Sequence, residues 1–123
     1  MAYEYLARDQ KLCVFDSDPG KLQGLASRAT FKEAVAAPLI LLCVPISEIE
    51  VLCKKIAPML RPGQIVVDTC SVKEKPIEWM LAHLPKTTQI LGTHPLFGPD
   101  SAREGIEGLK IALCPVRIKA ETY

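Results

Sequence analysis

The chain has 123 residues, of which 49% are hydrophobic and 24% are charged, a balance that fits one globular domain and excludes an intrinsically disordered protein. Its net charge is +1, with Lys and Arg interspersed among Asp and Glu, so we expect no basic surface for nucleic acid. The longest apolar run, 34–44, is interrupted by Pro38 and is far shorter than the roughly 20 residues that span a membrane.

Short apolar runs alternate with longer amphipathic segments, which is typical of βα units and a mostly parallel sheet. In chain order, we predict a strand at 11–15, helices at 19–27 and 32–36, a strand at 39–44, a helix at 48–60, a strand at 64–67, a helix at 73–84, and strands at 89–91 and 109–114. Residues 1–9 have the pattern of the latter part of an amphipathic helix. The sequence therefore predicts an α/β fold with a Rossmann-like, doubly wound, mostly parallel sheet.

Helix starts are marked by a repeated pattern, Ser or Thr followed three residues later by Glu, which is typical of a capping box. The pattern occurs at Thr30/Glu33, Ser47/Glu50, Ser71/Glu74 and Ser101/Glu104. In addition, Asp18 before Pro19 predicts an N-cap with proline at the first helical position.

Polar residues follow several of the predicted strands. Asp16, Ser71 and His94 each lie at or just beyond a carboxyl end. In open α/β sheets, ligands bind in the crevice outside these ends, so we expect the three side chains to share one rim. Asp68 also ends a strand, but an aspartate beside a helix start is usually satisfied by backbone amides, and we do not count it as catalytic.

A glycine-rich phosphate loop is not found in the sequence. A dinucleotide-binding unit begins with a strand and a Gly-x-Gly-x-x-Gly turn, and an acidic residue follows about 20 positions later. The seven glycines contain no Gly-x-Gly, yet Asp16 stands where that acidic residue is expected. We infer that the chain starts within the first helix of such a unit and lacks the first strand. Because that strand is central in the sheet, its absence leaves strand edges unpaired and favours self-association.

Two segments, "VVDTCSVKEKP" (66–76) and "ILGTHPLFGPDS" (90–101), resemble the nucleotide-binding domain of the prephenate and arogenate dehydrogenases. The likeness continues through "VFDSDPGKL", "ILLCVPISEIEVL" and "GLKIALCPV" and covers nearly the whole chain. It implies that residues 1–123 are a partial NAD-binding domain, without the helical dimerisation domain that follows it in the family. The implied reaction is the NAD-dependent oxidative decarboxylation of prephenate or arogenate in tyrosine biosynthesis.

The resemblance also implies roles for individual residues. His94 matches the catalytic histidine that accepts the proton of the substrate hydroxyl, and Ser71 matches the serine that hydrogen-bonds both. Independently of the resemblance, Lys73 lies in the first turn of the predicted helix 73–84, where a cation opposes the helix dipole. This unfavourable position indicates a local role near the nicotinamide or the substrate carboxylate. The cofactor contacts implied are Asp16, Val44, Pro45 and Ser71. Asp16 would bind the ribose hydroxyls and repel a 2′-phosphate, which favours NAD over NADP.

Each of these residues also has a plain structural interpretation. His94 could pack in a turn, Ser71 could cap a helix, Lys73 could be solvated, and Asp16 could belong to a turn. At the level of function, two alternatives stay open. One is a related NAD-dependent β-hydroxyacid dehydrogenase, and the other is a non-catalytic remnant that acts as a binding or regulatory module.

The chain has an odd number of cysteines with no Cys-x-x-Cys pair, and most lie in apolar stretches. They are Cys13, Cys43, Cys53, Cys70 and Cys114. We therefore expect reduced thiols, a cytoplasmic protein and no metal site. Cys70 lies before a predicted helix, where a reactive thiol would be placed, but no second histidine is positioned to activate it.

Overall fold

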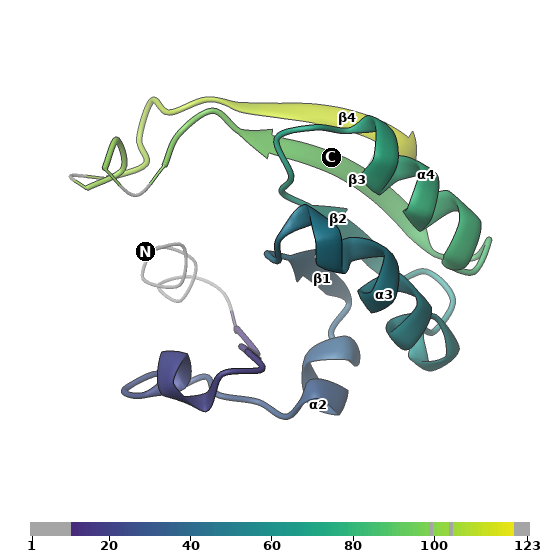
Figure 1. Cartoon of the computed structure of the whole chain (residues 1–123), viewed down its shortest axis with the longest axis horizontal. Coiled ribbons are helices and arrows are strands. Elements are labelled where there is room, and N and C mark those ends of the chain that lie inside the picture. Colours follow the sequence, from purple (N-terminus) through teal and green to yellow (C-terminus); the bar gives the residue numbers. More distant parts are fainter. Residues whose placement is uncertain (1–10, 99, 104, 120–123) are drawn as a thin grey trace.

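The computed structural model describes residues 11–98, 100–103 and 105–119 (Figure 1). Its centre is a four-stranded sheet in the order β1-β2-β3-β4. The strands are β1 (Leu39–Leu42), β2 (Ile65–Asp68), β3 (Gln89–Pro95) and β4 (Ile111–Arg117). The first three are parallel, and β4 is antiparallel to β3. This confirms the predicted Rossmann-like, mostly parallel sheet; the predicted helix 1–9 lies outside the described residues.

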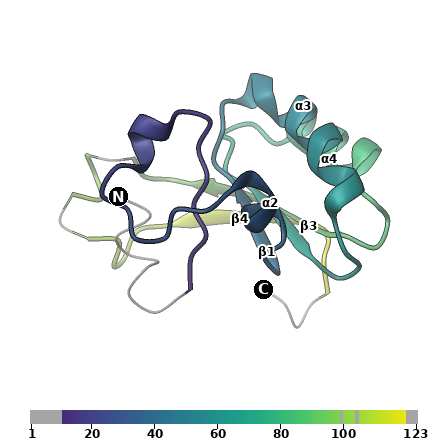
Figure 2. The same ribbon diagram turned by 90° about the horizontal axis from the view of Figure 1, so that it is seen from below.

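Two helices cover one face of this sheet, α3 (Ile46–Ile56) between β1 and β2, and α4 (Glu74–His83) between β2 and β3 (Figure 2). Alternate residues of each strand point toward them, because side chains in a strand alternate between its two faces. The resulting core contains Ile40, Leu42, Val66 and Ile90 from the sheet and Ile49, Cys53, Ile56, Met80 and Leu84 from the helical side. The short helix α2 (Phe31–Val35) adds Val35 to the same core.

The opposite face of the sheet carries apolar side chains that remain exposed. Leu39 and Leu41 of β1 are 53% and 40% exposed, and Ile111 and Leu113 of β4 are 49% and 47% exposed. Between them, Val67 is buried. The two outer strands therefore leave apolar surface uncovered on this face.

The predicted strand 11–15 and helix 19–27 are wrong. Val14 forms only an isolated bridge with Arg28, because no neighbouring strand within the described residues pairs with it. The helix is reduced to the 3-10 turn η1 (Pro19–Leu22), and Gly24 follows with a φ of 77°. Its start is as predicted, since Asp18 Oδ1 accepts a hydrogen bond from Gly20 N at 2.9 Å.

Other elements differ from the prediction at their ends. β3 extends to Pro95 rather than stopping at Leu91, because β4 pairs with it antiparallel and supplies hydrogen bonds along its second half. Consequently His94 lies inside a strand, opposite Ala112, and not in a loop. α3 ends at Ile56, and the chain continues as the 3-10 turn η2 (Ala57–Met59), which contains Pro58.

Of the predicted capping boxes, the one at α2 is present and two are wrong. Thr30 and Glu33 exchange their hydrogen bonds, with Thr30 N donating to Glu33 Oε2 at 2.8 Å. α3 begins at Ile46 directly after Pro45, which places Ser47 inside the first turn. α4 begins only at Glu74, so Ser71 lies too far before it to act as a cap. The fourth box includes Glu104, which is outside the described residues.

Candidate functional site

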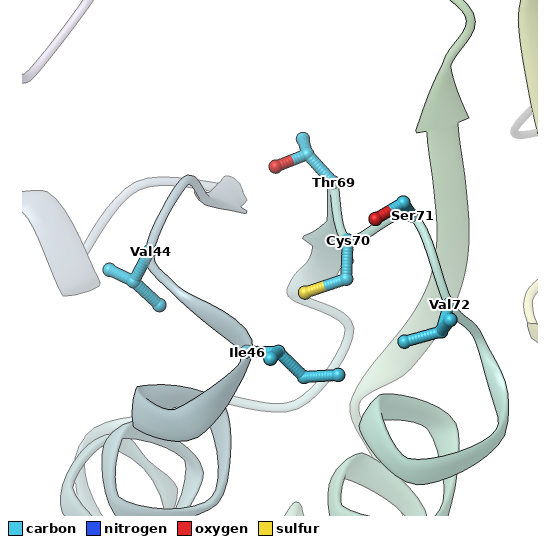
Figure 3. A pocket seen from close by; sticks show the side chains of 6 residues that line it. All are labelled: Val44, Ile46, Thr69, Cys70, Ser71 and Val72. Atoms are coloured by element: carbon cyan, nitrogen blue, oxygen red, sulfur yellow. The ribbon is translucent and has the colours of Figure 1, made fainter.

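A pocket of about 260 Å³ opens at the carboxyl ends of β1 and β2 (Figure 3). Its lining combines apolar side chains with hydroxyl and thiol groups: Val44, Ile46, Thr69, Cys70, Ser71 and Val72. Both Val44 and Ser71 were predicted to contact a cofactor, and the fold brings them into one pocket. Pro45, the third predicted residue of this region, lies between Val44 and Ile46 in the chain but does not line the pocket.

Asp68 and Lys73 form an ion pair at the start of the loop that carries Ser71. The Asp68 side chain is fully buried, and that of Lys73 is 18% exposed. Lys73 Nζ also donates to the carbonyl oxygen of Thr93 at 2.5 Å, and Asp68 Oδ2 accepts from Cys70 N at 3.0 Å. The ammonium group therefore has two protein partners, and the contact of Lys73 with a substrate stays a prediction.

His94 is half-buried near the end of β3. Within the described residues, its buried Nδ1 atom has no hydrogen-bond partner. Ser71 and His94 form no hydrogen bond with each other in the described part of the chain, and their convergence on one substrate stays a prediction. The loop after β2 turns back at its start, where Cys70 N donates to Asp68 Oδ2 at 3.0 Å. Ser71, the next residue, lines the pocket (Figure 3).

Asp16 lies far from Ser71 and His94 in the sequence, and it does not line the pocket. Its Oδ1 atom accepts from Asp18 N at 2.8 Å, and its Oδ2 atom lies 3.8 Å from Lys21 Nζ. These are the contacts of a turn aspartate. The segment that contains it lies to the left in Figure 1, on the side to which the arrowhead of β3 points. Its predicted contact with a ribose stays a prediction.

Cys70 lines the pocket, but its surroundings oppose thiolate formation. Burial raises its pKa, and the negative charge of Asp68 raises it further. A nucleophilic cysteine requires the reverse. The Cys70 side chain therefore lines the pocket and is not expected to react as a nucleophile. Within the ranges that the structure describes, no cluster of three acidic, histidine or cysteine side chains could hold a metal ion.

Sequence reasoning missed several pocket residues and the place of Asp68. Ile46, Thr69 and Val72 line the pocket although we did not single them out. A signal was available, because all three lie within five residues of a predicted strand end. Nothing in the sequence indicated that Asp68 would pair with Lys73, since that contact depends on the path of the loop between them.

Residues 16–121 match the family model described as the nucleotide-binding domain of prephenate dehydrogenase. This chain belongs to that family. Arogenate dehydrogenase 2 of Arabidopsis thaliana, a chloroplastic protein, is 38% identical over 81 residues, which are 65% of this chain and 23% of that protein. A probable arogenate/prephenate dehydrogenase of Methanocaldococcus jannaschii is 35% identical over 63 residues, or 51% of this chain and 14% of that protein. The chain thus spans less than a quarter of these two relatives.

Two solved structures share the fold. Prephenate dehydrogenase from Aquifex aeolicus, in complex with hydroxyphenyl propionate and NAD+, has a TM-score of 0.72 and 21% sequence identity. The match covers 98% of this chain and 46% of that one. A semialdehyde dehydrogenase NAD-binding protein from Cupriavidus necator, in complex with calcium and NAD, has a TM-score of 0.67 with 21% identity, covering 98% and 49%. In the described part of this prephenate dehydrogenase family member, no helix is both long and apolar enough to cross a membrane.

Proposed function

We propose that this chain is the NAD-binding part of an enzyme that oxidatively decarboxylates prephenate or arogenate. The observation that carries the proposal is the position of His94. It lies near the carboxyl end of β3, the strand next to the one that leads into the Ser71 pocket. Its ring nitrogen Nδ1 has no protein partner within the described residues. A half-buried imidazole at this edge can serve as a proton acceptor through the part of the ring that a substrate can reach.

The pocket residues fit part of a nicotinamide dinucleotide. Val44, Ile46 and Val72 offer apolar surface to a ring, and the hydroxyls of Thr69 and Ser71 offer hydrogen bonds. When bound, NAD would accept the hydride that leaves the substrate carbon. Asp16 would hold the ribose hydroxyls through its carboxylate and disfavour a 2′-phosphate, which supports NAD over NADP.

The protein's own contribution is to take a proton and to orient the substrate. In the proposed reaction, His94 accepts the proton of the ring hydroxyl as that carbon is oxidised, and the ring carboxylate leaves as carbon dioxide. The Ser71 hydroxyl can donate to one group and accept from another, so it can bind the same substrate hydroxyl. Ser71 is exposed and His94 is half-buried, so both side chains are open to a substrate.

The test replaces His94 by Asn in the longest encoded polypeptide that contains this chain. Turnover of prephenate and arogenate, followed as NADH formation, should fall by roughly 10²- to 10⁴-fold, as is typical for loss of a general base. The affinity for NAD, measured by calorimetry, should stay within twofold because His94 does not line the pocket.

The matched control is His83→Asn. His83 lies at the end of α4, where its Nε2 atom is 3.2 Å from Glu50 Oε1, and it has no place in the proposed site. This variant should keep full turnover. Equal turnover in the parent and the His94→Asn variant would reject the assignment. If the parent protein turns over simple β-hydroxyacids but neither prephenate nor arogenate, the alternative of a related NAD-dependent β-hydroxyacid dehydrogenase is favoured. If it binds NAD but turns over none of these compounds, the alternative of a non-catalytic binding module is favoured.

We also propose that this chain associates with itself. Within the described residues, β1 pairs only with β2, so its outer edge has no strand partner. The exposed leucines of β1 lie beside that edge. An unpaired strand edge next to apolar surface favours contact with a second copy.

A further inference from the structure

The buried carboxylate of Asp68 contacts the loop that carries Ser71 at two points. Its Oδ2 atom accepts from Cys70 N, the residue directly before Ser71, at 3.0 Å. The same oxygen pairs with Lys73 Nζ, two residues after Ser71. The loop that carries Ser71 is therefore attached to the end of β2 on both sides of the serine.

Lys73 extends this attachment to the strand that carries His94. Its Nζ atom donates to Thr93 O at 2.5 Å, on the residue directly before His94. A second bond joins the same two strands, because Thr93 Oγ1 donates to Asp68 O at 2.6 Å. The histidine backbone is thus fixed relative to β2 from two directions.

Gly92 shows that the lysine stem occupies a narrow passage. A Cβ atom built on Gly92 would lie 3.3 Å from Lys73 Cδ and 3.2 Å from Cys114 Cβ. Gly92 is the strand partner of Asp68 in the sheet, so the stem passes directly over the β2–β3 pairing. Any side chain larger than hydrogen at this position would press on Lys73 or on β4.

We propose that Asp68 and Lys73 are positioning residues that fix His94 relative to Ser71. The inference rests on the proposed function of those two residues. Ser71 and His94 do not hydrogen-bond each other, so their separation must be set by other groups. The Asp68–Lys73 pair is attached to the backbone beside each of them. A buried ion pair adds little net stability compared with apolar residues, whereas its directed hydrogen bonds fix geometry.

The experiment compares three variants of the polypeptide used above. Asp68→Asn keeps the shape of the side chain but leaves the Lys73 ammonium without its counter-charge. Asp68→Asn/Lys73→Met removes both charges and the bond to Thr93 O. Glu78→Gln is the matched control, because it breaks the exposed ion pair of Lys75 and Glu78 in α4. For each we would measure kcat, the Michaelis constants, the urea midpoint of unfolding and the NMR signals of the His94 ring.

The double variant separates positioning from stability. We expect Asp68→Asn to lower both the urea midpoint and kcat, since it leaves a buried unpaired charge. The double variant should regain the urea midpoint, while kcat stays about 10²-fold low, as for a misplaced reacting group. Its His94 ring signals should move, whereas those of His83 should not. Glu78→Gln should match the parent in every measurement.

Recovery of kcat together with the urea midpoint in the double variant would overturn the proposal, since it would show a purely structural role. Unchanged His94 signals would overturn it too. If the parent turns over neither prephenate nor arogenate, the proposed function fails, and the His94 signals still decide whether the pair positions the ring. If the charge variants do not fold, Gly92→Ala provides a second test, because it keeps both charges and presses on Lys73. We expect this variant to move the His94 ring signals. Unchanged His94 signals in Gly92→Ala would refute the proposal.

Discussion

At the scale of single residues, the five thiols differ in how readily they can ionise. All five cysteines are free. Burial raises the pKa of Cys53 to about 11, and the negative charges of Asp68 and Glu50 act in the same direction. Burial also raises the pKa values of Cys43 and Cys70. Because the thiolate is the reactive form, these three side chains are poor nucleophiles at neutral pH.

We therefore predict an order of alkylation by iodoacetamide at pH 7.5. The exposed Cys13 should react first, and the fully buried Cys53 should stay unmodified in the folded protein. Mass spectrometry of peptides gives the extent of labelling at each site, and labelling in urea provides the reference in which all five react. Equal rates at Cys13 and Cys53 in the native protein would contradict the assigned burial.

The same raised pKa predicts a loss of stability in alkali. Below the ordinary thiol value, 9.0, Cys53 is neutral in both the folded and the unfolded chain, so it has no pH-dependent effect. Above that value the unfolded chain ionises first, and its free energy falls relative to that of the folded chain. The contribution of Cys53 to stability is therefore lost as the pH rises from 9.0 through about 11.

At the scale of elements, the buried Gln64 joins α2 to β2. Its Nε2 atom donates to Val35 O at 2.9 Å and to Ala37 O at 2.6 Å, both near the end of α2. Its Oε1 atom accepts from Arg61 N at 2.5 Å. Gly63, with a φ of 86°, allows the turn that places Gln64 at the start of β2. One amide side chain thus satisfies backbone groups from two separate segments.

Replacing Gln64 by Leu should lower the free energy of unfolding by about 1 to 3 kcal/mol, because three backbone groups lose their partner while apolar bulk is kept. Urea denaturation followed by circular dichroism measures the change as a lower midpoint with an unchanged slope. The control is Gln23→Leu at an exposed position, which should leave the midpoint unchanged. A Gln64→Leu midpoint equal to that of the parent would show that these hydrogen bonds add no stability.

At the scale of the whole molecule, the two faces of the sheet differ. α3 and α4 cover one face (Figure 2). On the other face, Leu39, Leu41, Ile111 and Leu113 of the outer strands stay exposed. In a fold of this class both faces of the sheet are normally covered. Exposed apolar residues on one sheet face are typical of an interaction surface.

We predict that this chain forms oligomers at tens of micromolar, measured by light scattering. Leu41→Lys/Leu113→Lys should shift the population to monomer, because charged side chains on an outer strand oppose apolar contact. Val51→Lys is the control, since Val51 is 61% exposed on α3, away from this face. A monomeric parent chain would refute the proposed self-association.

The sequence by itself determined the fold class and the family. The alternation of apolar runs with amphipathic segments depends on local chemistry, so β1, β2, α3 and α4 were predicted within a few residues of their observed bounds. The two motifs around Ser71 and His94 placed the chain in its family. Val44 and Ser71 were predicted at one ligand site, and they share a pocket because each follows a parallel strand.

The tertiary structure decided how these parts meet. The predicted strand 11–15 has the right composition, but a strand also needs a neighbour to accept its hydrogen bonds. Likewise β3 reaches His94 only because β4 pairs with it from a distant part of the chain. The position of Ser71 in the pocket and the part-buried bond from Lys73 to Thr93 O arise from the path of one loop over the sheet. Local patterns specify which residues are apolar or polar, whereas these contacts depend on which segments pack together.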